Sequence, residues 1–295
     1  RIQSGIALIQ VLLLTAILMV MMLSVHWEAR QQIKSASLAK ERAQAALLLN
    51  SVEAELTFAL LTEKRRRKTD AASPIARQWN FFNHPFDTAN ATVAIEDVAS
   101  MLSLTNPSSL QKLVSQLGAD EQKAQQVVAA LKDWQDNDTE TSFNGAEQAD
   151  YPSVIIRNGP MQTESEIRFL RHIDARLYCL IKPHITVAPR RYTNYFMMPT
   201  ERQQYFVDPD NAAQIASDRL AEQLTSHQFE MLSGIPFGDF QNYSPSDTLR
   251  LSFTVRVNSV KLSRLLTLSI NPNAVEPVKV WDYYKYYYAD HENCR

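Results

Sequence analysis

The chain has 295 residues, of which 45% are hydrophobic, enough for one or two domains with buried cores. Its 30 Lys and Arg nearly balance 32 Asp and Glu, and the net charge of -2 lacks the basic excess of a nucleic-acid-binding protein. Only six glycines are present, which excludes collagen-like and glycine-linker proteins and disfavours glycine-rich nucleotide-binding loops.

An uncharged apolar segment occupies residues 6–25. Its length matches the roughly 20 apolar residues with which a helix crosses a bilayer. It is longer than the apolar core of a signal peptide, which has about 7–15 residues, and no small-x-small cleavage pattern follows it. We therefore expect a membrane-anchored helix rather than a cleaved signal peptide.

The same helix is predicted to continue far beyond the membrane. Residues 43–61 contain no Pro or Gly, and five apolar side chains recur there at helical spacing: Ala45, Leu49, Val52, Leu56 and Ala59. Residues 6–62 would then form one rod about 85 Å long. The apolar stripe packs either against the chain's own sheet or against neighbouring subunits, and we favour its own sheet. The basic run 64–68 is interpreted as a solvated helix end.

Between residues 107 and 240 the pattern indicates short helices joined by polar loops. Pro107 suits the start of the first helix and Gly118 suits its end. Thr163 and Glu166 form the pattern of a capping box. Three later helices are predicted to begin after capping aspartates, which are Asp120, Asp174 and Asp208.

Strand patterns flank this helical region on both sides. Residues 92–104 are predicted to form a hairpin of two short strands. Residues 249–257 alternate strictly between apolar and polar, 262–270 form a second strand, and the aromatic-rich stretch 278–288 a third. The simplest architecture is one sheet, packed on the amphipathic half of the first helix and interrupted by a helical domain.

The sequence contains no serine-hydrolase, zinc-protease, P-loop or dinucleotide-binding motif, and its six histidines show no metal-ligand spacing. Acidic residues cluster after a predicted helix end, at Asp133, Asp136, Asp138, Glu140 and Glu147. Oxygen ligands on a loop suit calcium, although the spacing is not that of an EF-hand. A solvated acidic turn is the alternative interpretation. Cys179 and Cys294, the two cysteines, form either one disulfide or two free thiols.

Several segments, taken in chain order, resemble one family. Ser4-Gly5 before the apolar run resembles the leader junction of type IV prepilins, which implies cleavage between Gly5 and Ile6 by prepilin peptidase. Such proteins normally carry Glu at the position of Gln10, and the K subunit of the type II secretion system (GspK) lacks that Glu. Later segments similar to GspK are IEDVASMLSLTN (95–106), DWQDND (133–138), NGAE (144–147) and NGP (158–160). The chain thus resembles a divergent GspK minor pseudopilin.

The resemblance implies a type IV pilin-like fold of the α+β class, with a long N-terminal helix on an antiparallel sheet and an inserted, all-helical SAM-like domain. The implied division is as follows: end of the leader, 1–5; N-terminal helix, 6–62, with the transmembrane part 6–25; loop and first strands, 63–106; inserted helical domain, 107–245; remaining strands, 246–295.

The resemblance also implies a non-enzymatic subunit, anchored in the inner membrane of a Gram-negative bacterium with its bulk in the periplasm. It would cap the tip of a pseudopilus and help to initiate it, because the bulky insert would block a further subunit. Its partners would be I-like and J-like minor pseudopilins, prepilin peptidase and the inner-membrane secretion platform, but no nucleic acid. A neutral Gln10 suits a tip subunit, which has no preceding N-terminal amine to pair with. Calcium is the one cofactor that the resemblance suggests.

The alternative function is a membrane-anchored periplasmic enzyme or binding protein, which an active-site cluster of carboxylates would favour. A DNA-binding module would need a basic face on the helical region, where the acidic cluster argues against it. Arg30, Lys34, Lys40 and Arg42 follow the apolar run, and the positive-inside rule alone would place the C-terminal part in the cytoplasm. We expect an upstream leader to supply balancing charges, since the sequence starts at Arg1 rather than at Met.

Overall fold

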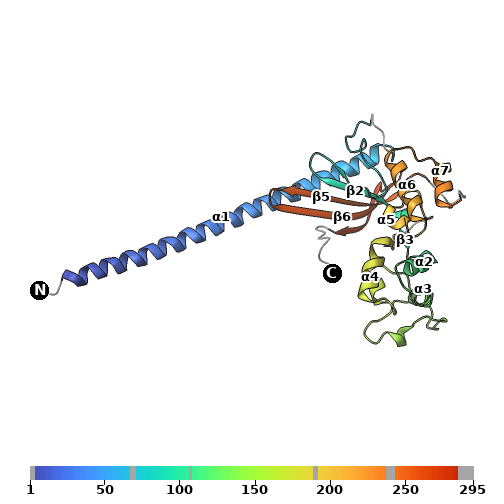
Figure 1. Ribbon diagram of the computed structural model, residues 1–295, viewed down its shortest axis with the longest axis horizontal. Helices are drawn as coiled ribbons and strands as arrows, with labels where there is room; N and C mark the ends of the chain where they lie inside the picture. Colours follow the sequence, from blue (N-terminus) through green and yellow to red (C-terminus); the bar gives the residue numbers. More distant parts are fainter. Residues whose placement is uncertain (1–3, 67–70, 106–107, 189–191, 237–242, 285–295) are drawn as a thin grey trace.

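The computed structural model describes residues 4–66, 71–105, 108–188, 192–236 and 243–284. Helix α1, Ser4–Thr62, is a single rod; its first half projects away from the rest, and a sheet packs along its second half (Figure 1). Its 59 residues span about 88 Å. In the described part of the chain it is the one helix long and apolar enough to cross a membrane, and none of its most apolar window is buried. The predicted rod and the α+β class are confirmed.

The second half of α1 packs through the predicted apolar stripe. All five stripe residues are at most 3% exposed: Ala45, Leu49, Val52, Leu56 and Ala59. They share one core with the inward faces of β5, Thr248–Val257, and β6, Val260–Ile270. The stripe therefore covers the chain's own sheet, as the favoured interpretation expected.

The sheet has five strands in the order β1-β2-β5-β6-β7, and every neighbouring pair is antiparallel. The outer members are β1, Phe86–Asp87, and β7, Val278–Tyr284, and β2 is Thr92–Asp97. Strands β5 to β7 lie where the sequence pattern predicts them, although residues 285–288 of the third predicted strand lie outside the described residues. Strand β2 pairs with β5 although the helices lie between them in the sequence, so the sheet is interrupted as expected.

The hairpin predicted over residues 92–104 is wrong. Strand β2 ends at Asp97, whose side chain accepts a hydrogen bond from the Ala99 amide and caps a 3-10 turn, η1, Val98–Ser100. The chain then forms β3, Leu102–Ser103, which pairs in parallel with β4, Ile185–Thr186. Because the capped turn directs the chain out of the sheet, β2 and β3 do not pair with each other.

The helical region forms two lobes with separate cores (Figure 1). The side lobe contains α2, Ser108–Gln116, α3, Glu121–Gln135, and α4, Ala175–Ile181, with the 3-10 helices η2, Gln148–Asp150, η3, Glu164–Phe169, and η4, Lys182–His184. The end lobe contains α5, Thr200–Gln203, α6, Pro209–Leu220, and α7, Ser226–Ser233. The region that the sequence presents as one helical domain thus has two cores, and the predicted domain boundaries and SAM-like fold stay predictions.

Most of the predicted helix signals act as expected. Asp120, Asp174 and Asp208 accept hydrogen bonds from the first turns of α3, α4 and α6. Thr163 and Glu166 form the predicted capping box, on η3. Pro107 lies outside the described residues. The local sequence therefore predicts where these helices begin.

Arg202 of α5 joins the sheet to both lobes. Its guanidinium forms a buried ion pair with Glu96 of β2, with 2.8 Å between nitrogen and oxygen. It also donates to the carbonyl oxygens of Ser100 and Pro183, where the chain enters and leaves the side lobe. Burial and the Arg202 charge lower the pKa of His184 to about 4, so that its neutral ring accepts a hydrogen bond from Arg202.

Replacing Leu56 by Ala tests the packing of α1 on the sheet. Leu56 has no exposed surface, so the truncation leaves a cavity and should lower the free energy of unfolding by about 2–5 kcal/mol. Thermal unfolding of the detergent-solubilised full chain, followed by circular dichroism, measures this as a lower Tm. Leu47→Ala is the matched control, since Leu47 lies on the same helix and is 68% exposed. Equal losses in the two variants would contradict the packing.

Candidate metal centre

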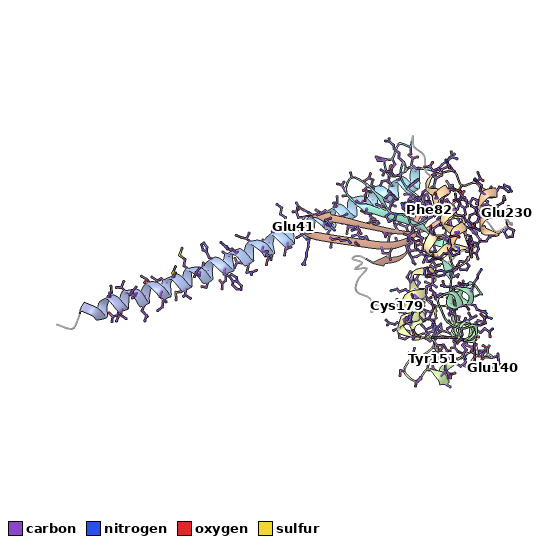
Figure 2. The ribbon with its side chains drawn as sticks, viewed as in Figure 1. Glu41, Phe82, Glu140, Tyr151, Cys179 and Glu230 are labelled. Atoms are coloured by element: carbon purple, nitrogen blue, oxygen red, sulfur yellow. The ribbon has the colours of Figure 1, made fainter. Side chains whose placement is uncertain are left out.

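The loops after α3 bring acidic side chains together at the end of the side lobe away from the sheet, where Figure 2 labels Glu140 and Tyr151. Carboxylate oxygens of Asp136, Asp138 and Glu147 lie within 4.8 Å of one another. Three of the five sequence-predicted calcium ligands therefore form one group, which we call the acidic cluster.

Several oxygen atoms at this place are buried and have no hydrogen-bond partner among the described residues. They are Oδ1 of Asp136, both carboxylate oxygens of Glu147 and Oδ1 of Asn158. Glu147 is only 3% exposed. Buried polar atoms without partners cost free energy, so these oxygens favour a nearby cation or ordered water. Calcium binds about six to eight oxygens from carboxylates, amides, carbonyls and water, and this donor set fits it.

The electrostatics of the acidic cluster also favour a cation. Burial raises the pKa of Asp136, and repulsion from Asp138 and Asp133 adds to the effect. Burial also raises the pKa of Glu147, with smaller contributions from the same neighbouring carboxylates. A carboxyl whose folded-state pKa is raised contributes stability below its unfolded-state pKa, and this contribution is lost as pH rises through the folded-state pKa. At neutral pH the metal-free cluster therefore destabilises the fold, and a bound cation would relieve the repulsion.

The other two predicted ligands have different roles. Asp133 is 1% exposed, and its carboxylate accepts hydrogen bonds from the amide and the hydroxyl of Ser142, so it holds the loop in place. Glu140 is exposed, and its amide donates to the side chain of Asp138. Neither residue belongs to the group of converging oxygens.

Asn158 is a candidate ligand that the sequence reasoning missed. Its Nδ2 donates to the carbonyl oxygen of Asp138 at 2.6 Å, which places the amide beside the acidic cluster. Its backbone has a positive φ of 48°, a conformation that Asn tolerates better than most residues. The Asn-Gly pair at 158–159 was the available signal, because it marks a turn, but a turn does not by itself indicate a ligand.

The residues around the acidic cluster support its loop. The rings of Trp134 and Tyr151 meet edge to face, with centroids 5.4 Å apart. A Cβ atom at Gly145 would lie 1.9 Å from Oδ2 of Asp133, so only Gly lets the backbone pass over this buried carboxylate. These contacts give a structural reason for the Asp133-Trp134 and Asn144-Gly145 positions of the DWQDND and NGAE segments.

The remaining predicted sites lie elsewhere. Gly5 and Ile6 belong to the first turn of α1, and Gln10 is exposed on the same helix. Cys179 on α4 is disulfide-bonded. Cys294 lies outside the described residues, so its pairing with Cys179 stays a prediction.

These features define the class of the protein: an α+β chain whose single long apolar helix is suited to anchor it in a membrane. Residues 83–190, which include the acidic cluster, match the family model described as type II secretion system (T2SS), protein K. The chain is 27% identical over 204 residues to the type II secretion system protein K of Klebsiella pneumoniae. This match covers 62% of this chain and 62% of the relative. It is 25% identical over 216 residues to that of Aeromonas hydrophila, covering 64% of this chain and 65% of the relative.

A solved structure shares the fold. It is the crystal structure of the GspK-GspI-GspJ complex from the type 2 secretion system of enterotoxigenic Escherichia coli, and one of its chains matches with a TM-score of 0.56 and 17% identity. The match covers 86% of this chain and 98% of that chain. Together these matches support a member of the type II secretion system protein K family. The chain spans 62% of the length of the Klebsiella relative.

Replacing Gly145 by Ala should distort the loop of the acidic cluster, because the new methyl group would overlap the Asp133 carboxylate. We expect a lower Tm of the full chain and a loss of calcium binding. Gly159→Ala is the matched control in the same loop region, since its Cβ would meet no atom nearer than 3.9 Å. Calorimetric titration with calcium and thermal unfolding measure both effects, and a Gly145→Ala variant that binds calcium normally would contradict the described loop.

Calcium should raise the Tm of the full chain near neutral pH and have much less effect near pH 5, because protons compete with the cation for carboxylates of raised pKa. At a free calcium concentration of about 100 times Kd, the expected gain is about 2.7 kcal/mol. Glu147→Gln should abolish the response, whereas Glu140→Gln, outside the cluster, should retain it. Thermal unfolding in calcium and in EDTA decides between these outcomes, and a response that survives Glu147→Gln would disprove the site.

Proposed function

We propose that the chain is a minor pseudopilin at the tip of a type II secretion pseudopilus, where it caps the assembly and helps to initiate it for protein export across the outer membrane. Family membership supports the general role. The single observation that carries the proposal is that α1 has two apolar faces, while the chain's own sheet covers only one of them.

The uncovered face lies opposite the buried stripe. Leu47 and Phe58 are 68% and 67% exposed, and each is two positions, about 200° around the helix, from a buried stripe residue. Exposed Ala43 and Ala54 lie on the same face, at spacings that a helix places in one row. We take this row of two large and two small apolar side chains as a protein-binding surface. A neighbouring helix that runs parallel to α1 from the same membrane would cover this row.

The proposed partners are I-like and J-like minor pseudopilins. The solved chain of similar fold comes from a complex of GspK, GspI and GspJ, which supports this choice. The exposed apolar first half of α1 supports a single-pass anchor in the inner membrane, with the bulk of the chain in the periplasm. In this proposal prepilin peptidase cuts between Gly5 and Ile6, and the inner-membrane platform adds the mature chain to the assembly.

The two lobes carry the capping role in this proposal. The end lobe lies beyond the end of α1 that is opposite the membrane segment, and the side lobe lies to one side of that end (Figure 1), so together they would obstruct a subunit stacked above. Gln10 is consistent with this position, because a carboxylate in an apolar helix bundle needs a charged partner that a tip subunit lacks. Calcium at the acidic cluster would hold the side lobe in its folded shape.

Copurification tests the proposed partner surface. Leu47→Glu and Phe58→Glu place charges in the uncovered face, so each should sharply reduce recovery of the I-like and J-like subunits with the tagged full chain. The Tm should stay unchanged, because both positions are exposed. Gln122→Glu on α3, also exposed, is the control for added charge. Full recovery of both subunits with the two α1 variants, or no copurification at all with the unaltered chain, would refute the proposal.

A further inference from the structure

A cavity of about 490 Å³ lies between the sheet and the end lobe. Its walls come from the loop after α1, the end of α6 and the segment Tyr243 to Pro245. Figure 2 labels Phe82, one of the lining residues, at this junction, whereas the acidic cluster lies at the far end of the side lobe. The volume is that of a site for a small ligand or a few side chains of a peptide. We call it the Arg219 cavity.

Six aromatic side chains contribute to the wall. They are Trp79, Phe81, Phe82, Phe86, Phe196 and Tyr243. The Phe196 and Tyr243 rings meet edge to face with centroids 4.8 Å apart. The Trp79 indole nitrogen donates to the carbonyl oxygen of Arg66 at 3.0 Å, which fixes that ring. The wall therefore offers aromatic surface, mixed with polar groups, that is held in position, which favours the binding of another aromatic side chain.

Arg219, in the last turn of α6, adds a buried cation to this wall. It is 7% exposed, and its guanidinium lies 4.2 Å from the centroid of the Phe82 ring. Nη1 donates to the carbonyl oxygens of Phe196 and Met198 at 2.8 and 2.9 Å, whereas Nε has no acceptor among the described residues. A guanidinium carries five N–H donors, so two neutral carbonyl groups satisfy only part of it.

The carboxylate of Glu201 acts electrostatically on Arg219, but no carboxylate among the described residues forms an ion pair with its guanidinium. Burial lowers its pKa to about 10, so the side chain is still protonated at neutral pH. The nearby Arg65 is already paired with Asp247, at 2.7 Å. Arg66 is exposed at the rim and adds positive charge, and Glu222 adds one carboxylate there. The helix C-terminus and the Phe82 ring make the buried cation tolerable, but neither supplies an acceptor for its remaining donors.

We propose that the Arg219 cavity binds a peptide segment of a partner protein in which a carboxylate adjoins an aromatic side chain. The aromatic ring would contact the aromatic side chains of the wall, and the carboxylate would accept charge-assisted hydrogen bonds from Arg219. The site is separate from both the α1 surface and the acidic cluster, so this inference goes beyond the proposed pseudopilin function and does not depend on it.

Fluorescence anisotropy of labelled peptides tests this recognition on the full chain in detergent. The probe is fluorescein-Gly-Phe-Asp-Phe-Gly-amide, and its matched controls replace Asp by Asn or both Phe by Ala. We expect saturable binding of the probe and at least about tenfold weaker binding of each control, because each lacks one half of the recognised chemistry. The absence of saturable binding up to about 1 mM, or equal affinity for the Asn peptide, would overturn the proposal.

Three variants locate the binding site. Leu220→Trp should weaken binding at least about tenfold by filling the cavity, since Leu220 lines it and is 45% exposed, and Arg219 stays intact. Arg219→Gln should weaken binding as strongly by removing the charge. Arg168→Gln is the matched control, because Arg168 also stacks on a ring, Phe169, at 4.7 Å, but outside the cavity. Its affinity should equal that of the unaltered chain.

Each variant's Tm is measured beside its affinity, so that a folding defect is recognised. Leu220→Trp keeps the test decisive where Arg219→Gln fails to fold, because it changes a partly exposed side chain. Unchanged affinity in Leu220→Trp overturns the proposal, as does displacement of the probe by equal concentrations of sodium acetate, which would reveal a simple anion site. Copurification with the I-like and J-like subunits should be unaffected by all three variants, so failure here and failure of the pseudopilin proposal are distinguishable.

Discussion

The buried ion pair between Arg202 and Glu96 is the contact on which the arrangement of the sheet and the two lobes depends. Arg202 also holds the carbonyl oxygens at both ends of the side lobe, so one side chain ties the lobe's entry and exit to strand β2. Removing one partner of a buried ion pair costs about 3–5 kcal/mol, because the other charge stays buried without compensation. The lobes are thereby fixed relative to α1.

The helical region contains two places where the chain does not satisfy its own polar groups. At the acidic cluster, buried oxygens of Asp136, Glu147 and Asn158 lack donors. In the Arg219 cavity, a buried cation has two carbonyl acceptors but none for its Nε. One place favours a cation and the other an anion, and they lie far apart in the helical region (Figure 2). In the proposed assembly, the single long helix α1 supplies both the anchor and a surface for neighbouring subunits.

Much of the fold was predictable because it depends on local periodicity. The stripe from Ala45 to Ala59 and the alternation in β5 each bury one face, and capping aspartates mark the starts of α3, α4 and α6. The resemblance to GspK also rested on short segments in chain order, and the family comparisons confirm it. The hairpin failed because β3 pairs with β4, a two-residue strand far away in the sequence, and nothing in residues 92–104 indicates that partner.

The pattern of residues alone was sufficient for the long helix, the strand segments, the family and an acidic loop, since each depends on neighbours within a few turns or on motif order. Only the tertiary structure distinguishes the acidic residues from one another. The carboxylates of Asp136, Asp138 and Glu147 lie close together, whereas that of Asp133 accepts a hydrogen bond from Ser142. Asn158 contacts the carbonyl oxygen of Asp138 from a separate turn. The Arg219 cavity also depends on the tertiary structure, because its walls come from segments distant in the chain. The position of a residue in the sequence does not show which distant backbone or side chain will exclude water from it. That loss of water contact determines the chemistry of the residue.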